Sequence, residues 1–332
     1  LQVKEIDWLV KDYIESDSIS LIFGEPGCGK SFIAISMACA IATGTNWYGR
    51  EVRQGSVVYI AGEGHNGLAR RFKAWEKGSG NSLTGVNLFK SHKAAQLFDP
   101  SQLQQVIESI DSLPAKPTCI IIDTLARNYG GDENSTQDMS LFIAALDALR
   151  IRYKCAIVVV HHSGKASPGQ ARGSTALRGA VDAEYSVDRD PTSLVIVLQN
   201  RKMKDGEVPQ PIQFSIRSIG LGVYDSTNAE ISGGYLESVD LSGLLDKAKL
   251  KTEYMGKNQR KCLTALEGLL YARKADSVIL DDWREACREA GMDRHAYRDA
   301  KDGLLNKGII QILGGNTVRI ARENCEKPCE SV

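Results

Sequence analysis

Residues Gly24-Glu25-Pro26-Gly27-Cys28-Gly29-Lys30-Ser31 decide the fold that the sequence predicts. They fit the pattern G-x-x-x-x-G-K-[ST] of a phosphate-binding P-loop. The apolar run 19–23 before them is typical of a short buried strand, and residues 31–42 after them of a helix. This strand–loop–helix order is the context that the motif requires. It makes a glycine-rich turn with an incidental lysine the weaker interpretation.

The loop has the chemistry of a triphosphate site. Gly24, Gly27 and Gly29 let the backbone turn its N–H groups inward around phosphates, at the positive end of the following helix. Lys30 is expected to reach the β- and γ-phosphates, and the Ser31 hydroxyl to bind Mg²⁺. ATP and Mg²⁺ are thus the predicted cofactors, and the predicted binding loop also includes Glu25, Pro26, Cys28 and Phe32. Cys28 is interpreted as filler, although a thiol at a helix N-terminus is open to oxidation.

Composition sets broad limits on the function. The chain has 332 residues and equal numbers of basic and acidic residues, 41 of each. Zero net charge gives no bulk attraction for nucleic acid, so DNA binding would need local patches. The 8 cysteines lack metal-ligand spacing and predict reduced thiols. No apolar run approaches a membrane span and no signal peptide is visible, which predicts a cytoplasmic protein without a membrane partner.

The rest of the N-terminal part predicts an α/β fold. Apolar runs alternate with amphipathic stretches, which indicates a mainly parallel sheet with helices on both faces. The expected strands are 19–23, 56–61, 86–91, 118–124 and 156–160, and the expected helices are 31–42, 67–77, 100–112 and 138–153. Further strands near 183–187, 193–199, 212–216 and 222–224 predict a β-meander that extends the sheet.

Acidic residues at two strand ends complete the predicted site. Asp123 follows Ile120-Ile121-Ile122, the apolar strand and acid of a Walker B element, and is expected to hold Mg²⁺ opposite Ser31. Glu63 follows the strand 56–61 and is the candidate for polarising the attacking water. Asp132 and Glu133, in the loop after Asp123, are the alternatives; all three could instead be ordinary solvated acids.

Two histidines follow a third strand at this edge. His161 or His162 is expected to hydrogen-bond the γ-phosphate and to relay its presence to the next loop; the sequence leaves open which of them does so. Two ordinary strand-end histidines are the alternative.

Together these segments resemble the RepA-type replicative helicases of plasmids and phages, which are RecA/DnaB-like hexameric ATPases. The resemblance covers roughly residues 1–230 and rests on GEPGCGKS, AGEGH, IIIDTLARNYGGDENS, VVVHHSGK, ARGSTALRGAVDAE and LQNRKMKDGE. It implies a RecA-like core and a ring, expected to be a hexamer, with ATP between neighbouring subunits. Lys30, Ser31, Asp123 and Glu63 match the family's phosphate, magnesium and catalytic positions.

The resemblance also implies residues that act between subunits and on DNA. Arg201 lies where a neighbour's arginine finger is expected, with Lys202 and Lys204 as adjacent alternatives. Residues 164–175 would face the central channel, where Lys165 and Arg172 would meet the phosphates of single-stranded DNA. Other replication proteins are possible partners.

The C-terminal part predicts a separate small domain. Expected helices at 260–272, up to Glu289 and 294–306 precede a hairpin of strands 309–313 and 317–321, an arrangement that resembles a winged helix-turn-helix. Asp281 or Asp282 is expected to cap the second helix, and Asp293 the third. Arg294, Arg298 and Lys301 share one face of the third helix, which is expected to contact DNA or, alternatively, protein.

These features predict a RecA-like ATPase domain at 1–237, a linker at 238–258, a winged-helix-like domain at 259–322 and a tail at 323–332. The function they favour is an ATP-dependent helicase or translocase in the replication of a plasmid, phage or integrated element. A regulatory switch ATPase without unwinding activity is the alternative. A small-molecule kinase is a distant third, because the sequence shows no recognisable pocket for a molecule that would accept the phosphate.

Overall fold

A computed structural model describes residues 5–62, 64–133, 135–163, 175–190, 194–239, 256–273, 275, 277–306, 309–314 and 316–320. The chain divides into two compact units, Leu1–Val239 and Asp240–Val332. The predicted tail 323–332 and nearly all of the predicted linker lie outside the described residues. In the part of the chain that the structure covers, no helix is both long and apolar enough to cross a membrane.

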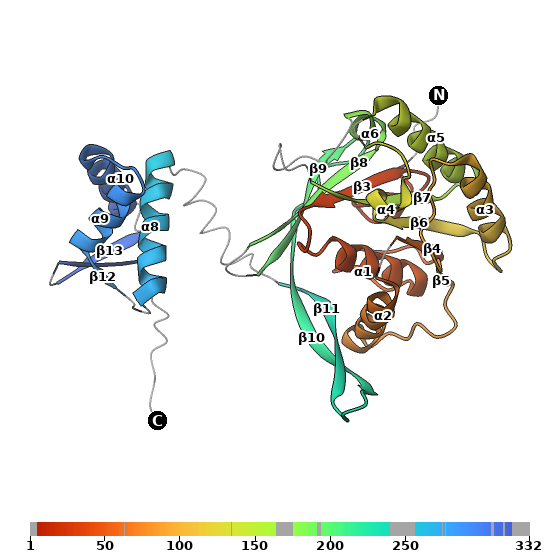
Figure 1. The fold of residues 1–332 in the computed structure, drawn as a ribbon, viewed down its shortest axis with the longest axis horizontal. Coiled ribbons are helices and arrows are strands. Elements are labelled where there is room, and N and C mark those ends of the chain that lie inside the picture. Colours follow the sequence, from red (N-terminus) through yellow and green to blue (C-terminus); the bar gives the residue numbers. More distant parts are fainter. Residues whose placement is uncertain are drawn as a thin grey trace. The chain divides into compact units, whose positions relative to one another are not determined.

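The first unit is built on a mixed sheet of nine strands in the order β11-β10-β9-β8-β3-β7-β6-β4-β5 (Figure 1). The strands from β8 to β5 in this order run parallel, and β9, β10 and β11 are added antiparallel. Their bounds are β3 Ile19–Gly24, β4 Ser56–Ala61, β5 Leu88–Lys90, β6 Pro117–Asp123, β7 Ala156–His162, β8 Ala183–Arg189, β9 Ile196–Met203, β10 Ile212–Tyr224 and β11 Glu230–Ser238. The α/β fold with a mainly parallel sheet and an antiparallel extension is confirmed.

Helices cover both faces of this sheet (Figure 1). On one face lie α1 (Lys30–Thr43) and α2 (His65–Ser79), together with the short hairpin of β1 (Trp8–Val10) and β2 (Ile14–Glu15). On the other lie α3 (Pro100–Asp111), α4 (Leu125–Asn128), α5 (Thr136–Tyr153) and α6 (Thr175–Ala180). Central strands such as β3 are buried over their whole length, as continuous apolar runs in a parallel sheet require.

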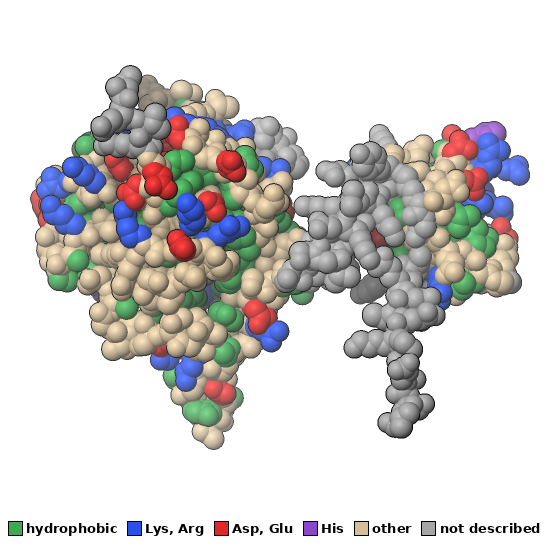
Figure 2. All heavy atoms as spheres, turned by 180° about the vertical axis from the view of Figure 1, so that it is seen from behind, with side chains coloured by type: hydrophobic (Ala, Val, Ile, Leu, Met, Phe, Trp, Pro, Cys, Tyr) green, Lys and Arg blue, Asp and Glu red, His purple; other side chains and the backbone are tan. Residues whose placement is uncertain are grey.

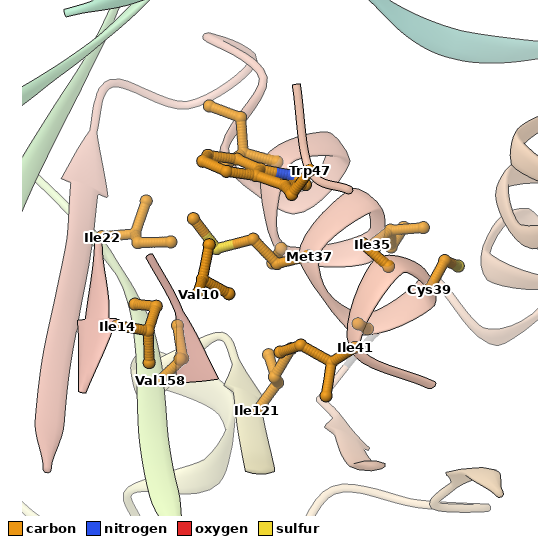
Figure 3. Packing of buried hydrophobic residues seen from close by; sticks show 14 of the residues in the cluster. Val10, Ile14, Ile22, Ile35, Met37, Cys39, Ile41, Trp47, Ile121 and Val158 are labelled. Carbon is orange, nitrogen blue, oxygen red and sulfur yellow. The ribbon is translucent and has the colours of Figure 1, made fainter. Parts of the chain in front are cut away.

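Apolar packing holds α1 against the sheet. Met37 and Ile41 of α1 lie against Ile121 and Val158 of the strands, in the cluster shown in Figure 3. The indole of Trp47 closes the end of this cluster and donates from Nε1 to Ser36 Oγ at 2.7 Å. This packing fixes α1, and with it the loop that precedes α1, relative to the strand ends.

Several elements were not expected from the sequence. The runs 212–216 and 222–224 are one long strand, β10, and β11, β1, β2 and α4 are additional. Gly220 lies between the two runs and Gly222 begins the second; both lower strand propensity, and pairing with β11 keeps this stretch extended. The strand β11 carries Gly233 and Gly234 in its interior, and these glycines lower its strand propensity, so the sequence alone does not predict it.

The second unit contains α8 (Lys257–Arg273), α9 (Leu280–Glu289) and α10 (Arg294–Asn306), with a three-stranded antiparallel sheet. Its strands are β12 (Val278–Ile279), β13 (Ile310–Leu313) and β14 (Thr317–Ile320). Trp283 is fully buried at the centre and donates from Nε1 to Cys262 O at 2.8 Å. The expected inward face of α10, Tyr297, Ala300 and Leu304, is buried.

Of the two helix caps predicted in this unit, the structure confirms the one at α10 and contradicts the one at α9. Asp293 accepts a hydrogen bond from the Ala296 N–H at 2.8 Å, as an N-cap does. The prediction that Asp281 or Asp282 caps α9 is wrong: Ile279 holds that position, and both carboxylates lie inside the first turn. There they face the positive end of the helix dipole, and Asp282 also pairs with Arg273 of α8.

Two adjacent residues of α5 provide a test of the packing. Phe142 is fully buried against Tyr129, with ring centroids 5.3 Å apart, whereas its neighbour Leu141 is 51% exposed. We expect Phe142→Ala to lower the free energy of unfolding of the first unit by roughly 3–5 kcal/mol, because it leaves a cavity. Leu141→Ala should change it by less than about 0.5 kcal/mol. Urea unfolding of both variants measures the difference, and similar losses would contradict the described core.

Candidate phosphate-binding site

The predicted phosphate loop joins the end of β3 to the start of α1. Gly29 precedes the helix at φ 109°, in the left-handed region that glycine tolerates. A Cβ on Gly24 would lie 2.2 Å from the Val187 carbonyl oxygen of β8, so the loop also needs glycine for close approach. The helix has no side-chain N-cap, which leaves its positive end for an anion.

Lys30 lies inside this loop. Its ammonium donates to the carbonyl oxygens of Gly24 at 2.9 Å and Glu25 at 2.7 Å, and lies 3.8 Å from Cys28 Sγ. Burial lowers the pKa of Lys30, and the nearby Cys28 and Asp123 oppose this shift. The charge is therefore held next to the loop backbone, at the position where phosphate oxygens would replace carbonyl oxygens as its partners.

Asp123 lies at the end of β6 with 8% of its surface exposed. Its Oδ2 accepts a hydrogen bond from the Tyr59 hydroxyl at 2.5 Å, while its buried Oδ1 has no hydrogen-bond partner among the described residues. Burial raises the pKa of Asp123; Tyr59, Ser31 and the charges of Arg71 and Lys30 oppose the shift. A buried carboxylate oxygen beside a serine hydroxyl fits the oxygen ligands that Mg²⁺ prefers.

Side chains along β7 point alternately to the two faces of the sheet, so His161 and His162 lie on opposite faces. Val158 and Val160 pack in the cluster on the α1 face of the sheet, and Val159 in the cluster on the opposite face. Successive strand residues point to opposite faces, so His162 lies on the face of α1 and His161 on the other. The same rule puts Asp123 on the α1 face, because Cys119 and Ile121 of β6 pack there. His162 is also in register with Gly24 of the phosphate loop.

The comparison with known protein families agrees with this geometry. A family model described as an AAA domain matches residues 2–168. The chain belongs to this AAA domain family. It is a P-loop ATPase. No match is found among curated proteins.

Some predicted site residues of the ATPase lie outside the described residues: Glu63, Lys165 and Arg172. The residue before Glu63, Gly62, donates its N–H to the Asp123 carbonyl at 2.7 Å, so β4 ends beside the Walker B acid. The alternatives Asp132 and Glu133 lie between α4 and α5. There the Asp132 N–H is bonded to Asp138 Oδ2 at 3.0 Å, which ties this loop to α5.

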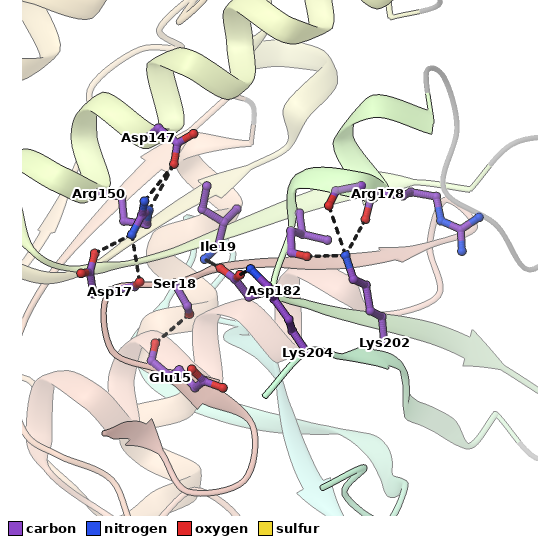
Figure 4. A network of polar contacts seen from close by, with 12 residues as sticks. Glu15, Asp17, Ser18, Ile19, Asp147, Arg150, Arg178, Asp182, Lys202 and Lys204 are labelled. Atoms are coloured by element: carbon purple, nitrogen blue, oxygen red, sulfur yellow. Dashed lines mark hydrogen bonds and ion pairs between the residues drawn. The ribbon is translucent and has the colours of Figure 1, made fainter. Parts of the chain in front are cut away.

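The basic residues of β9 and the turn after it differ in how firmly they are held. Lys202 donates to the carbonyl oxygens of Arg178, Gly179 and Val181, at the end of α6, and Lys204 pairs with Asp182 at 3.3 Å (Figure 4). Arg201 donates to Ser186 Oγ at 2.9 Å and lies 3.7 Å from Asp188, with 38% of its side chain exposed. Lys202 therefore has a structural role, and Arg201 is the residue better placed to turn outward.

The structure adds site residues that the sequence did not indicate. Arg71 of α2 lies over the Phe32 ring, 4.7 Å from its centroid, and favours the charged form of Asp123. Phe32 thus contacts α2 with its ring, while its N–H bonds to Gly29 within the first turn of α1. Tyr59 fixes Asp123 as described. Only the folded sheet brings β4, β6 and α2 together, and no local motif signals these contacts.

The loop is also held from two neighbouring strands. Ser163, after β7, donates from its N–H to the Gly24 carbonyl and from Oγ to Glu25 Oε1, both at 3.0 Å. On the other side a cavity of about 330 Å³ lies between the loop and the end of β8. It is lined by residues Glu25, Pro26, Gly27, Cys28, Val187, Asp188, Arg189, Asp190 and Leu194. The buried Cys28 thiol beside it has a raised pKa because of burial, which disfavours the oxidation-prone thiolate.

The predicted basic face of the second unit carries acids as well. Arg298 lies 3.4 Å from Asp299, and Lys301 lies 3.1 Å from Asp302. Arg294 is exposed at the start of α10. Figure 2 shows basic, acidic and histidine side chains intermixed on this unit. The paired acids reduce the attraction that this face would exert on a phosphate backbone.

The raised pKa of Asp123 leads to a prediction for Asp123→Asn. A buried carboxyl with a raised pKa costs folding free energy when it is charged, so at pH 8 the nucleotide-free variant should melt above the wild type. The difference should shrink as the pH falls through the raised pKa, because the wild-type carboxyl then becomes neutral. The variant should also lose the rise in melting temperature that Mg²⁺ and ATP give the wild type. Thermal melts across pH measure both effects; equal melting at pH 8 would contradict the burial argument.

Proposed function

We propose that this ATPase is an ATP-dependent DNA helicase or translocase, with a RecA-like core that works as a ring, in the replication of a plasmid, phage or integrated element. The observation that carries the proposal is that Lys30 begins α1 just after β3, while Asp123 and His162 end the nearby strands β6 and β7 on the same face of the sheet. The strand β7 lies between β3 and β6, so His162 stands between the phosphate loop and the metal carboxylate. A group in that position can report the γ-phosphate to the chain that follows it.

Each residue has a role in this proposal. Lys30 and the N–H groups of the loop would bind the β- and γ-phosphates, and Ser31 with Asp123 would hold Mg²⁺, which neutralises phosphate charge when bound. Glu63 would polarise the attacking water. Arg201 of a neighbouring subunit would stabilise the charge that develops on the transferred phosphoryl group.

The coupling to DNA is proposed to run through residues 164–174. This segment starts next to Ser163, which is bonded to the phosphate loop, and it leads into α6. There Arg178 makes a bidentate pair with the buried Glu184 of β8, at 2.9 and 3.2 Å. The described residues on either side of this segment, Ser163 and those of α6, are therefore tied to elements that flank the phosphate loop. Lys165 and Arg172 would meet the phosphates of single-stranded DNA, so that a change at the loop reaches the DNA contact.

The second unit has the element order of a winged helix, and we propose that it contacts DNA or another replication protein through α10. One observation favours the alternative function, a regulatory switch ATPase without unwinding activity. Basic residues of α10 have acidic neighbours, and the chain as a whole has no net charge. A protein contact suits such a mixed surface better than a phosphate backbone does.

The nucleotide site is tested by two substitutions with different expected results. Lys30→Ala should abolish ATP hydrolysis and weaken ATP binding, because it removes the cation of the loop. Glu63→Gln should keep ATP binding near the wild-type affinity and lower turnover by a factor of about 10² or more, because it removes the base. Binding of a fluorescent ATP analogue and steady-state hydrolysis distinguish the two. Normal turnover in Glu63→Gln would exclude Glu63 as the base.

The motor function is tested by DNA stimulation and by strand displacement. Single-stranded DNA should raise the ATPase rate of the wild type, and the double variant Lys165→Ala with Arg172→Ala should lose this stimulation while it keeps the basal rate. The matched control replaces Lys11 and Lys116, two exposed lysines remote from the loop in sequence, by Ala. A wild type that hydrolyses ATP but neither responds to DNA nor displaces a strand would favour the switch.

A further inference from the structure

An apolar groove of about 660 Å³ lies at the β5 edge of the first unit, away from the phosphate loop. Its floor is formed by Val58 of β4, Phe89 of β5, and Val106 and Ile110 of α3. The strand β5 is the last strand of the sheet on this side, so one side of its backbone has no neighbouring strand within the sheet. A groove of this size and lining is in the range of sites that take up side chains or ligands.

The rim of the groove is basic. Lys90, His92 and Lys93 line it and are exposed, and none of its lining residues is acidic. An apolar floor with a rim that carries basic but no acidic side chains favours an occupant in which apolar side chains lie next to acidic ones.

The tip of the β10–β11 hairpin has this composition. Val223 is 50% exposed and Tyr224 is 60% exposed, so two neighbouring large side chains are available for contact on this projecting hairpin (Figure 1). Asp225 and Glu230 stand beside them at the turn. Hydrogen bonds from Thr227 and Ala229 lower the pKa of Asp225, so its charge persists at neutral pH.

The tip and the groove belong to opposite edges of the nine-stranded sheet. The hairpin packs against α2, where a Cβ on Gly233 would meet Ala74, so it lies on the α1 face of the sheet. Val58 and Ile110 of the groove pack in the cluster on the opposite face. The sheet and its helices stand in between, so a chain cannot place its own tip in its own groove.

Two different surfaces that fit each other form a head-to-tail contact, and repetition of such a contact closes a ring when the rotation permits. We infer that the β10–β11 tip of one copy of this chain docks Val223 and Tyr224 into the groove between β5 and α3 of a second copy, with Asp225 and Glu230 against the basic rim.

This inference rests on the ring of the proposed function and names one contact between its subunits, which can be tested separately. The first experiment compares Tyr224→Glu with Val208→Glu, a residue that is 65% exposed and lies outside the hairpin. Sedimentation equilibrium with a non-hydrolysable ATP analogue gives the concentration at half assembly. Tyr224→Glu should raise this concentration at least tenfold, and Val208→Glu should leave it within twofold. An unchanged value for Tyr224→Glu would overturn the inference.

The second experiment tests proximity directly. In a background with Cys325→Ser and Cys329→Ser, Tyr224→Cys is combined with Gln105→Cys on the groove side of α3. The control pairs Tyr224→Cys with Gln104→Cys, an exposed neighbour that does not line the groove. Mild oxidation of the first pair should give a ladder of disulfide-linked copies on a non-reducing gel, and the control should give little. No ladder, or equal ladders, would overturn the inference.

The outcomes separate this contact from the proposed function. Rings that persist in Tyr224→Glu, without the cross-link, would contradict the docking of the tip and leave the ring in place. A wild type that stays a monomer with nucleotide and DNA would contradict both, while ATP binding at Lys30 would still be measurable. Loss of assembly in Tyr224→Glu with normal ATP binding per chain would support the docking.

Discussion

The parallel register of β3, β7 and β6 is the constraint on which the rest of the structure depends. Gly24 pairs with His162, and Asp123 pairs with Val160, two residues earlier on β7. The phosphate loop, the histidine and the acid therefore lie at one edge of the sheet. Burial of these strands on both faces makes a slip of register costly, because a shift of one residue would turn every side chain to the other face. The positions of Lys30 and Asp123 are therefore fixed by apolar packing that extends through the whole first unit.

The site stores unfavourable electrostatics that a triphosphate and a metal would relieve. Lys30 has a lowered pKa and Asp123 a raised one, both because of burial. The Tyr59 hydroxyl of β4 holds the carboxylate by a hydrogen bond, so its geometry does not depend on the phosphate loop alone, and the charge of Arg71 on α2 favours its ionised form. Charges placed in advance, with their costs met by folding, are a common means by which enzymes bind phosphate groups that change charge during reaction. Ser163, which is bonded to the phosphate loop, directly precedes residues 164–174, so a movement of the loop would displace the start of this segment.

The parts of this arrangement differ in how far the sequence predicts them. The phosphate loop, the strand before Asp123 and the alternation of strands and helices follow from local patterns, and the structure places them as expected. The roles of Arg71 and Tyr59 depend on which elements are neighbours in the folded sheet. Which of His161 and His162 lies on the α1 face follows from the burial of both faces of β7, and no local pattern encodes either feature. The strand β11 was missed because its interior glycines are kept extended only by pairing with β10. The cap of α9 was misjudged because Asp281 and Asp282 satisfy the helix dipole from inside its first turn.

The most direct test of the central claim is a crystal structure of the protein with Mg²⁺ and a non-hydrolysable ATP analogue. The account predicts that the Lys30 ammonium leaves the carbonyls of Gly24 and Glu25 for the β- and γ-phosphates. Mg²⁺ should lie between Ser31 and Asp123, with His162 directed at the γ-phosphate. A nucleotide bound elsewhere, or Asp123 still buried against Tyr59 with no metal beside it, would contradict the account.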